Sequence, residues 1–239
     1  MAGLVNPLLA GRRNDARLEG PVEANERRDT EAMAGRVADQ GGRREEILTE
    51  AARLFAAHGY ETTSMNQLAA AVGVSKSLIY HYFPSKTELL YLLHHRVLTA
   101  GLAMAKAAQQ HESAAERFRG IIRGHIRLVL ENVDANLVLQ SARDRLPEDR
   151  DREVRRLRER YWEEVCRTYE DGVAEGSLRP VPKDLAVGAI LAACNWLYRW
   201  RPEGPGLSID EVADEFETLV GKGLFLGSAD RECDPARLT

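Results

Sequence analysis

The chain has 239 residues, of which 44% are hydrophobic, and a formal net charge of −4 at pH 7. No apolar run reaches the ~18 residues that a membrane span requires, and no secretion signal stands at the start, so we expect a cytoplasmic protein that does not bind membranes. The cysteines Cys166, Cys194 and Cys233 are widely spaced, which excludes a disulfide framework and a Cys-x-x-Cys metal site.

The first segment of the chain, residues 1–40, carries Gly, Asn, Pro and charges of both signs without a sustained apolar period. This composition predicts a flexible N-terminal arm. From Arg43 the apolar residues adopt helical spacing, and Gly59 stands where a left-handed C-cap is expected. The pattern predicts a first helix that ends before Gly59.

Two short helices are predicted next. Ser64 and Gln67 have the spacing of a capping box, which predicts a second helix over 65–72. Gly73 permits a tight turn, and Ser75 is a suitable N-cap for a third helix over 76–83, which Pro84 ends. Two short helices joined by a glycine turn form a helix-turn-helix.

The third helix has two faces when its residues are placed about 100° apart. One face is suited to packing and consists of Leu78, Ile79, Tyr82 and Phe83. The other face carries a cation, a hydroxyl, a phenol and an imidazole, on Lys76, Ser77, Tyr80 and His81. Such groups bind phosphates and base edges in a major groove. An aromatic-rich helix is also typical of a protein core, but the ordered caps and turns around this one favour DNA reading.

The segment RREEILTEAARLFAAHGYETTSMNQLAAAVGVSKSLIYHYFPSKTELL resembles the N-terminal domain of the TetR family of transcriptional regulators over about 48 residues. The resemblance implies an all-helical, homodimeric repressor. Its small N-terminal domain binds a palindromic operator in double-stranded DNA, and its larger C-terminal domain dimerises and binds a small effector.

The resemblance also implies roles for individual residues. Those expected to face bases are Lys76, Ser77 and His81. Those expected to hold phosphates are Thr63, Tyr80 and Lys86, the last beside the free N–H groups of the next helix. Ser75, at the start of the reading helix, is counted with the DNA-binding residues.

Helices are predicted throughout the remaining chain. A long helix over 85–109 joins the DNA-binding domain, expected at 41–88, to an effector-binding and dimerisation domain at 89–228, followed by a flexible tail at 229–239. Within the second domain the apolar spacing predicts further segments: an amphipathic helix around 118–129, a helix over 137–143, a long helix from 147 to Gly176, and helices over 185–200 and 209–226. The last two suit a four-helix dimer interface.

Three polar side chains interrupt apolar stripes of the second domain: His125, Trp162 and Asn195. Each can be a core or interface group with a satisfied hydrogen bond, or it can line a ligand pocket. The arginine run at 150–160 is first a solvated face, although it can also meet an anionic ligand.

The C-terminal segment LAVGAILAACNWLYRWRPEGPGLSIDEVADEFETLVGKGL resembles TetR-family regulators that respond to coenzyme A thioesters in phenylacetate, fatty-acid and sterol side-chain breakdown. That resemblance implies an acyl- or aryl-coenzyme A effector, and no other cofactor is expected. The same segment can instead reflect a shared dimer interface.

Two other classes of function are alternatives to this one. An enzyme is not expected, because His94 and His95 lack the spacing of a metalloprotease helix and no glycine-rich phosphate loop or nucleophile elbow occurs. A ligand-independent DNA-binding or interaction protein would have a body filled by side chains. A pocket larger than about 300 Å³ distinguishes the two readings.

Overall fold

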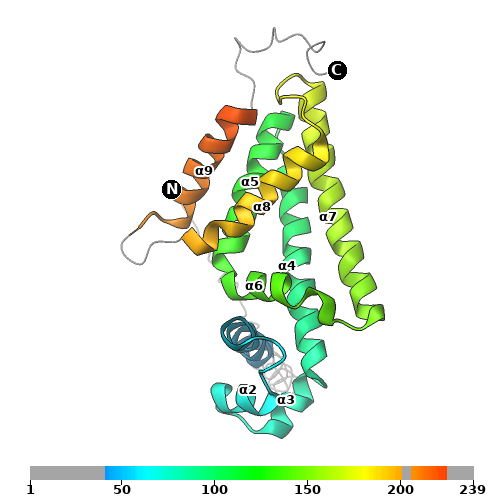
Figure 1. The fold of residues 1–239 in the computed structure, drawn as a ribbon, viewed down its shortest axis with the longest axis vertical. Coiled ribbons are helices and arrows are strands. Elements are labelled where there is room, and N and C mark those ends of the chain that lie inside the picture. Colours follow the sequence, from blue (N-terminus) through cyan, green and yellow to red (C-terminus); the bar gives the residue numbers. More distant parts are fainter. Residues whose placement is uncertain (1–40, 201–205, 225–239) are drawn as a thin grey trace, which may run out of the picture. The chain divides into compact units, whose positions relative to one another are not determined.

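The computed structural model describes residues 41–200 and 206–224. The predicted arm at 1–40 and tail at 229–239 lie outside the described residues. The chain divides into two units, Met1–Arg44 and Glu45–Thr239, and the fold below is that of the second. Its elements are helical, as the sequence predicts (Figure 1). Among the described residues, no helix combines the length and apolarity needed to cross a bilayer.

The helix-turn-helix forms where the sequence predicts it. The first helix runs to residue 58, and Gly59 follows with a φ of 90°. α2 spans Met65–Val72 behind a complete Ser64–Gln67 capping box, and Gly73 ends it with a φ of 73°. α3 spans Lys76–Tyr82, with the Ser75 hydroxyl accepting the Leu78 N–H. The structure confirms these local signals. They could be predicted because each acts within four residues of the chain.

The two predicted faces of α3 are confirmed by burial. Ile79 and Phe83 are fully buried, and Leu78 and Tyr82 are partly buried. They join one apolar cluster with the first helix and α2, whose most buried members include Ile47, Phe55 and Leu68. The opposite face of α3 is left in solvent.

The other helices form the body of the protein (Figure 1). Their bounds are α4 Lys86–Ala108, α5 Ala114–Glu131, α6 Val133–Ser141, the short 3-10 turn η1 Arg143–Arg145, α7 Glu148–Ala174, α8 Lys183–Trp200 and α9 Ile209–Leu224. α4 packs against both α5 and α7, and α5 also packs against α8 and α9. The predicted helix over 85–109 is confirmed by α4, and Gly176 follows α7 with a φ of 69°.

The predicted helix over 137–143 needs correction, because α6 begins at Val133 and ends at Ser141, and Arg143 belongs to η1. The cause lies at the junction with α5. The side-chain amides of Asn132 and Asn136 donate to the Leu128 carbonyl at 3.0 and 3.5 Å, and Asn132 leaves helical geometry. A new helix therefore starts directly after α5.

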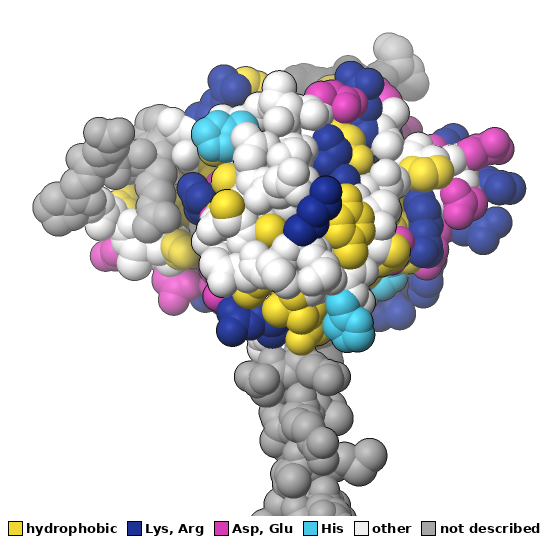
Figure 2. All heavy atoms as spheres, turned by 90° about the horizontal axis from the view of Figure 1, so that it is seen from below, with side chains coloured by type: hydrophobic (Ala, Val, Ile, Leu, Met, Phe, Trp, Pro, Cys, Tyr) yellow, Lys and Arg dark blue, Asp and Glu magenta, His cyan; other side chains and the backbone are white. Residues whose placement is uncertain are grey.

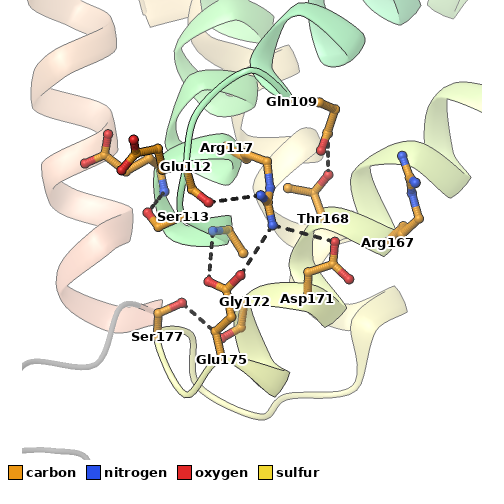
Figure 3. Close-up of polar contacts among 12 residues, drawn as sticks. Gln109, Glu112, Ser113, Arg117, Arg167, Thr168, Asp171, Gly172, Glu175 and Ser177 are labelled. Atoms are coloured by element: carbon orange, nitrogen blue, oxygen red, sulfur yellow. Dashed lines mark hydrogen bonds and ion pairs between the residues drawn. The ribbon is translucent and has the colours of Figure 1, made fainter.

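Polar contacts join the ends of α4, α5 and α7 that lie away from α3 (Figure 3). The Arg117 guanidinium donates to the Glu175 carboxylate at 3.4 Å and to the Glu112 carbonyl at 3.2 Å. The Gln109 amide donates to the Thr168 hydroxyl at 2.8 Å. These contacts fix one end of the body around its apolar core.

Candidate functional site

The exposed face of α3 presents the polar side chains that the sequence assigns to DNA. Lys76, Ser77 and His81 are exposed, and Tyr80 is 42% exposed. Ser75 is exposed too, and its hydroxyl is used as the α3 cap while lying 3.0 Å from the Ser77 hydroxyl. Figure 2 views the end that carries α2 and α3: Lys and Arg side chains cross the middle of this face, and acidic ones lie toward its edge.

Thr63 does not fit the predicted phosphate contact. Its side chain is 2% exposed, and the hydroxyl donates to the Gly59 carbonyl at 2.9 Å, with the Leu54 carbonyl 3.3 Å away. The hydroxyl thus satisfies the C-terminal carbonyls of the first helix. In this arrangement Thr63 fixes the turn before α2 and presents no side-chain donor to DNA.

Lys86 is tied to the same turn. Its ammonium donates to the carbonyls of Tyr60, Glu61 and Thr63 at 2.8, 3.2 and 3.1 Å, and it lies 4.4 Å from the centre of the Tyr60 ring. An ammonium has three donors, so all of them have partners here. A phosphate contact by Lys86 stays a prediction, and it would require exchange of at least one of these bonds.

A chamber of about 480 Å³ lies among the body helices. The three predicted ligand residues, His125, Trp162 and Asn195, all line it. They come from α5, α7 and α8, and α4 contributes Val97, Leu98 and Gly101. The chamber wall is mostly apolar with a few polar groups, as is usual for small-molecule sites.

The polar groups of the chamber form one hydrogen-bonded chain. His125 Nδ1 lies 2.8 Å from the Tyr161 hydroxyl, and His125 Nε2 lies 3.2 Å from Asn195 Oδ1. The Asn oxygen accepts, so Nε2 carries the proton and Nδ1 accepts from the tyrosine. Burial lowers the pKa of His125 to about 4, and burial raises the pKa of Tyr161. The chain is therefore neutral near pH 7.

Two arginines line the same chamber, Arg143 from η1 and Arg158 from α7. Neither makes an ion pair or a hydrogen bond within the described part of the chain. Arg158 lies one helical turn before Trp162. Burial and, next, the positive charge of Arg143 lower the pKa of Arg158. Arg158 is half-buried and Arg143 is exposed, and the negative charges of Asp151 and Asp144 act on the pKa of Arg158 in the opposite direction. The two guanidinium groups place positive charge beside the chamber, which favours an anion there.

Sequence reasoning missed Tyr161 and Arg143 as chamber residues. Tyr161 lies in an apolar stripe, so its hydroxyl needed a buried partner, and that need was the available signal. Arg143 had no such signal, because its place beside Arg158 depends on the turn η1. Within the described residues, no cluster of His, Cys, Asp or Glu is arranged to hold a metal ion.

Residues 47–91 match the family described as bacterial regulatory proteins of the tetR family, and residues 111–224 match the tetracyclin repressor-like C-terminal domain. The HTH-type transcriptional repressor KstR2 of Mycobacterium tuberculosis H37Rv is 28% identical over 204 residues, covering 79% of this chain and 96% of the relative.

Two solved structures are similar as well. The TetR family transcriptional regulator PfmR from Thermus thermophilus is 35% identical, with a TM-score of 0.67, over 73% of this chain and 96% of that one. AibR, solved in complex with isovaleryl coenzyme A and operator DNA, is 25% identical with a TM-score of 0.66, over 75% and 97%. With its helix-turn-helix and its helical body, the chain belongs to the TetR family of transcriptional regulators.

Proposed function

We propose that this regulator is a repressor that binds a palindromic operator as a homodimer and is released from it by an acyl- or aryl-coenzyme A thioester. The observation that carries the proposal is the chamber built on α4, the helix that begins beside the reading helix α3. A ligand in the chamber touches α4, which begins at Lys86, one of the predicted DNA-binding residues, directly after α3. The relatives named as repressors, and AibR with its bound isovaleryl coenzyme A and operator DNA, support the same reading.

The DNA-binding part of the proposal rests on α3. Lys76 and His81 are exposed on its free face, and each is expected to contact a base edge. Replacing either by alanine should weaken operator discrimination by about 1 to 3 kcal/mol, measured by competition against random duplex. If both variants discriminate the operator from random duplex as well as wild type does, the DNA-reading surface lies elsewhere.

The domain limits 41–88 and 89–228 also remain proposals, since one apolar cluster continues from the first helix through α4 to α6.

The homodimer is supported by apolar side chains on the surface of α8 and α9. Leu185 and Trp196 of α8 are 63% and 56% exposed, and Leu219 of α9 is 72% exposed. Leu191 belongs to the helix over 185–200 that the sequence predicts at the interface, but it lines the chamber and is 8% exposed, so it is not a probe of the interface. The better interface probes are therefore Trp196→Glu and Leu219→Glu, followed by sedimentation. A dimer unchanged by both would overturn this interface.

The chemistry of the chamber supports this effector class. An apolar acyl or aryl group is suited to the space lined by Val97, Leu98 and Trp162, and the Tyr161–His125–Asn195 chain supplies polar contacts for a carbonyl. The nucleotide of coenzyme A is too large and too anionic to bury cheaply. It would lie toward Arg143 and Arg158, whose guanidinium groups suit phosphates.

Release requires only a small coupling energy. A ligand that binds the DNA-incompetent arrangement more tightly by about 1.4 kcal/mol lowers operator affinity about tenfold. The test is a thermal-shift and operator-release screen that compares free acids with their coenzyme A thioesters. Thioesters are expected to raise the melting temperature and release the operator. Release by free acids or unrelated apolar compounds alone would refute the thioester assignment and leave the repressor proposal standing.

A second candidate is a DNA-binding protein without an effector. The chamber exceeds the ~300 Å³ at the lower end of ligand sites, which favours the ligand-responsive reading. Operator binding that no compound in the screen changes would favour this second candidate.

A further inference from the structure

A second cavity lies directly beside the ligand chamber. Its volume is about 640 Å³, and it lies between the first helix, α4 and the junction of α5 with α6. Within the described part of the chain, Val97 of α4 and Leu128 of α5 are the two residues that line both cavities. These two side chains therefore form a shared wall.

The wall is well positioned on the α5 side. The Leu128 carbonyl accepts hydrogen bonds from the side-chain amides of Asn132 and Asn136, which hold the last turn of α5. Across the wall, Gly101 of α4 has no side chain, and a Cβ built there would lie 3.5 Å from a Leu128 methyl. That distance is an ordinary van der Waals contact, so the Leu128 side chain faces Gly101 with room for about one methyl group between them. On the α4 side, Val97 is 5% exposed.

The second cavity differs from the chamber in character. It has charged residues in its lining, Arg96, Glu131 and Asp134, together with apolar ones such as Ala52 and Ala100. Ala52 and Thr49 belong to the first helix of the DNA-binding region. A ligand chain that passed the wall would leave the apolar chamber and touch that helix.

We propose that Val97 and Leu128 set the length of the acyl group that the chamber accepts. This inference rests on the proposed thioester function and adds its chain-length specificity. Each methylene that enters the chamber gains about fourfold in affinity, the equivalent of ~0.8 kcal/mol, until the chain meets the wall. A longer chain must fold back or leave methylenes in water, so the gain stops there.

The test is a titration of the full-length protein with straight-chain acyl-coenzyme A thioesters of increasing length, followed by calorimetry. Wild type should show affinity that rises about fourfold per methylene and then stops rising. Leu128→Ala opens the wall, so its affinity should continue to rise for longer chains. Val97→Ala removes fewer atoms and serves as a second opening variant if Leu128→Ala does not fold.

A filling variant makes the test specific. Ala100 lines the second cavity only, and it is an exposed helical residue where leucine is well tolerated. Ala100→Leu alone should bind like wild type, whereas Leu128→Ala with Ala100→Leu should return to the wild-type limit. Leu139→Ala is the matched control, because Leu139 lines the chamber without bordering the second cavity.

The outcomes distinguish this inference from the proposed thioester function on which it rests. A wild-type length limit that neither Leu128→Ala nor Val97→Ala moves would overturn the wall and leave the thioester function intact. A limit that Leu139→Ala moves equally would also overturn it, since extra volume alone would then be enough. Failure of every thioester to bind wild type, with operator binding retained, would overturn both.

Discussion

Two groups of arginines in the body have opposite surroundings. Arg119, Arg123 and Arg127 recur every four residues along α5 and face the acidic side chains of α9. Arg119 pairs with Glu217, Arg123 lies 3.1 Å from Asp214, and Arg127 lies 2.7 Å from Asp210. We call this set the α5–α9 ladder.

The chamber arginines, Arg143 and Arg158, form no such ion pairs within the described residues. Burial disfavours the charge of Arg158, and the charges of Asp151 and Asp144 offset this effect only in part, since the pKa of Arg158 is lowered. Both groups border cavities, since the α5–α9 ladder lines one of about 700 Å³. The two cavities therefore differ in whether a neighbouring helix neutralises their arginines. Arginines neutralised by a neighbouring helix hold that helix in place, whereas unpaired arginines beside an apolar chamber leave a place for an anion.

The largest expected effect is a loss of stability in acid caused by His125. It belongs to the neutral hydrogen-bonded chain of the chamber, in contrast to the charged α5–α9 ladder. Unfolded His125 takes up a proton near pH 6.5, but the folded side chain does so only at about pH 4. The free energy of unfolding should therefore fall by about 3 kcal/mol as the pH drops from 6.5 to 4, and the stability is fully present above pH 6.5. Urea unfolding across this range provides the measurement.

The control for this acid effect is His125→Gln, which removes the titrating ring. It should lose clearly less stability over the same pH range. Some loss is expected to remain, since burial also lowers the pKa of His94 and acts in the same direction. Identical pH profiles of wild type and variant would mean that His125 is not the buried neutral group described above.

The next effect tests the ladder. Glu217 is 4% exposed and contacts both Arg119 and Arg123, so Glu217→Gln removes one buried charge and leaves two arginines without it. We expect a loss of about 2 kcal/mol in the free energy of unfolding, because the guanidinium groups reach solvent and soften the penalty. Glu215→Gln, at an exposed position of α9, is the control and should change little. Equal losses of unfolding free energy in Glu217→Gln and Glu215→Gln would show that the buried carboxylate stabilises the ladder no more than an exposed one does.

The chamber arginine should behave in the opposite way. Arg158→Gln is expected to lower thioester affinity about tenfold, or ~1.4 kcal/mol, because a charge-assisted contact is lost. The free energy of unfolding should stay the same or rise slightly, since an unpaired, partly buried charge is removed. Calorimetric titration and urea unfolding measure the two quantities. Arg156→Gln on the exposed face of α7 is the control. A large loss of stability in Arg158→Gln would place it with the paired arginines.

The smallest effect concerns the outer end of the ladder. The side chains of Arg127 and Asp210 are 49% and 70% exposed. A double-mutant cycle with Arg127→Gln and Asp210→Asn should give a coupling of about 0.5 kcal/mol or less, and high salt should reduce it further. A coupling above ~1 kcal/mol that persists in high salt would show that the whole ladder behaves as one buried network.

Most of the helix-turn-helix could be predicted from the sequence because its signals are local. The Ser64–Gln67 box, the Ser75 cap and Gly73 act within a few residues, and the structure confirms all three. The partners of Lys86 could not be predicted, since the carbonyls it binds lie 23 to 26 residues earlier and meet it only through tertiary packing.

The chamber was predictable in part. His125, Trp162 and Asn195 were identified as polar groups on apolar stripes, and they do line one chamber. The link between His125 and Asn195 spans 70 residues, and the link to Tyr161 spans 36. No sequence period reports contacts of that range. The wall of Val97 and Leu128 could not be predicted from the sequence either, because both residues have the pattern of ordinary core positions.

The hydrogen bonds of Lys86 to the carbonyls of Tyr60, Glu61 and Thr63, here called the Lys86 clamp, connect α4 to the helix-turn-helix. Lys86 stands in the first turn of α4 and is bound to the turn that follows the first helix, so we expect rotation of α4 to move α2 and α3 with it. From Gly101 in the chamber wall to Lys86 the helix is about 22 Å long. A tilt of about 5° at the chamber therefore displaces the clamp by ~2 Å. In the proposed homodimer the same tilt in both subunits would change the spacing of the two reading helices by up to ~4 Å, more than the length of a hydrogen bond to a phosphate.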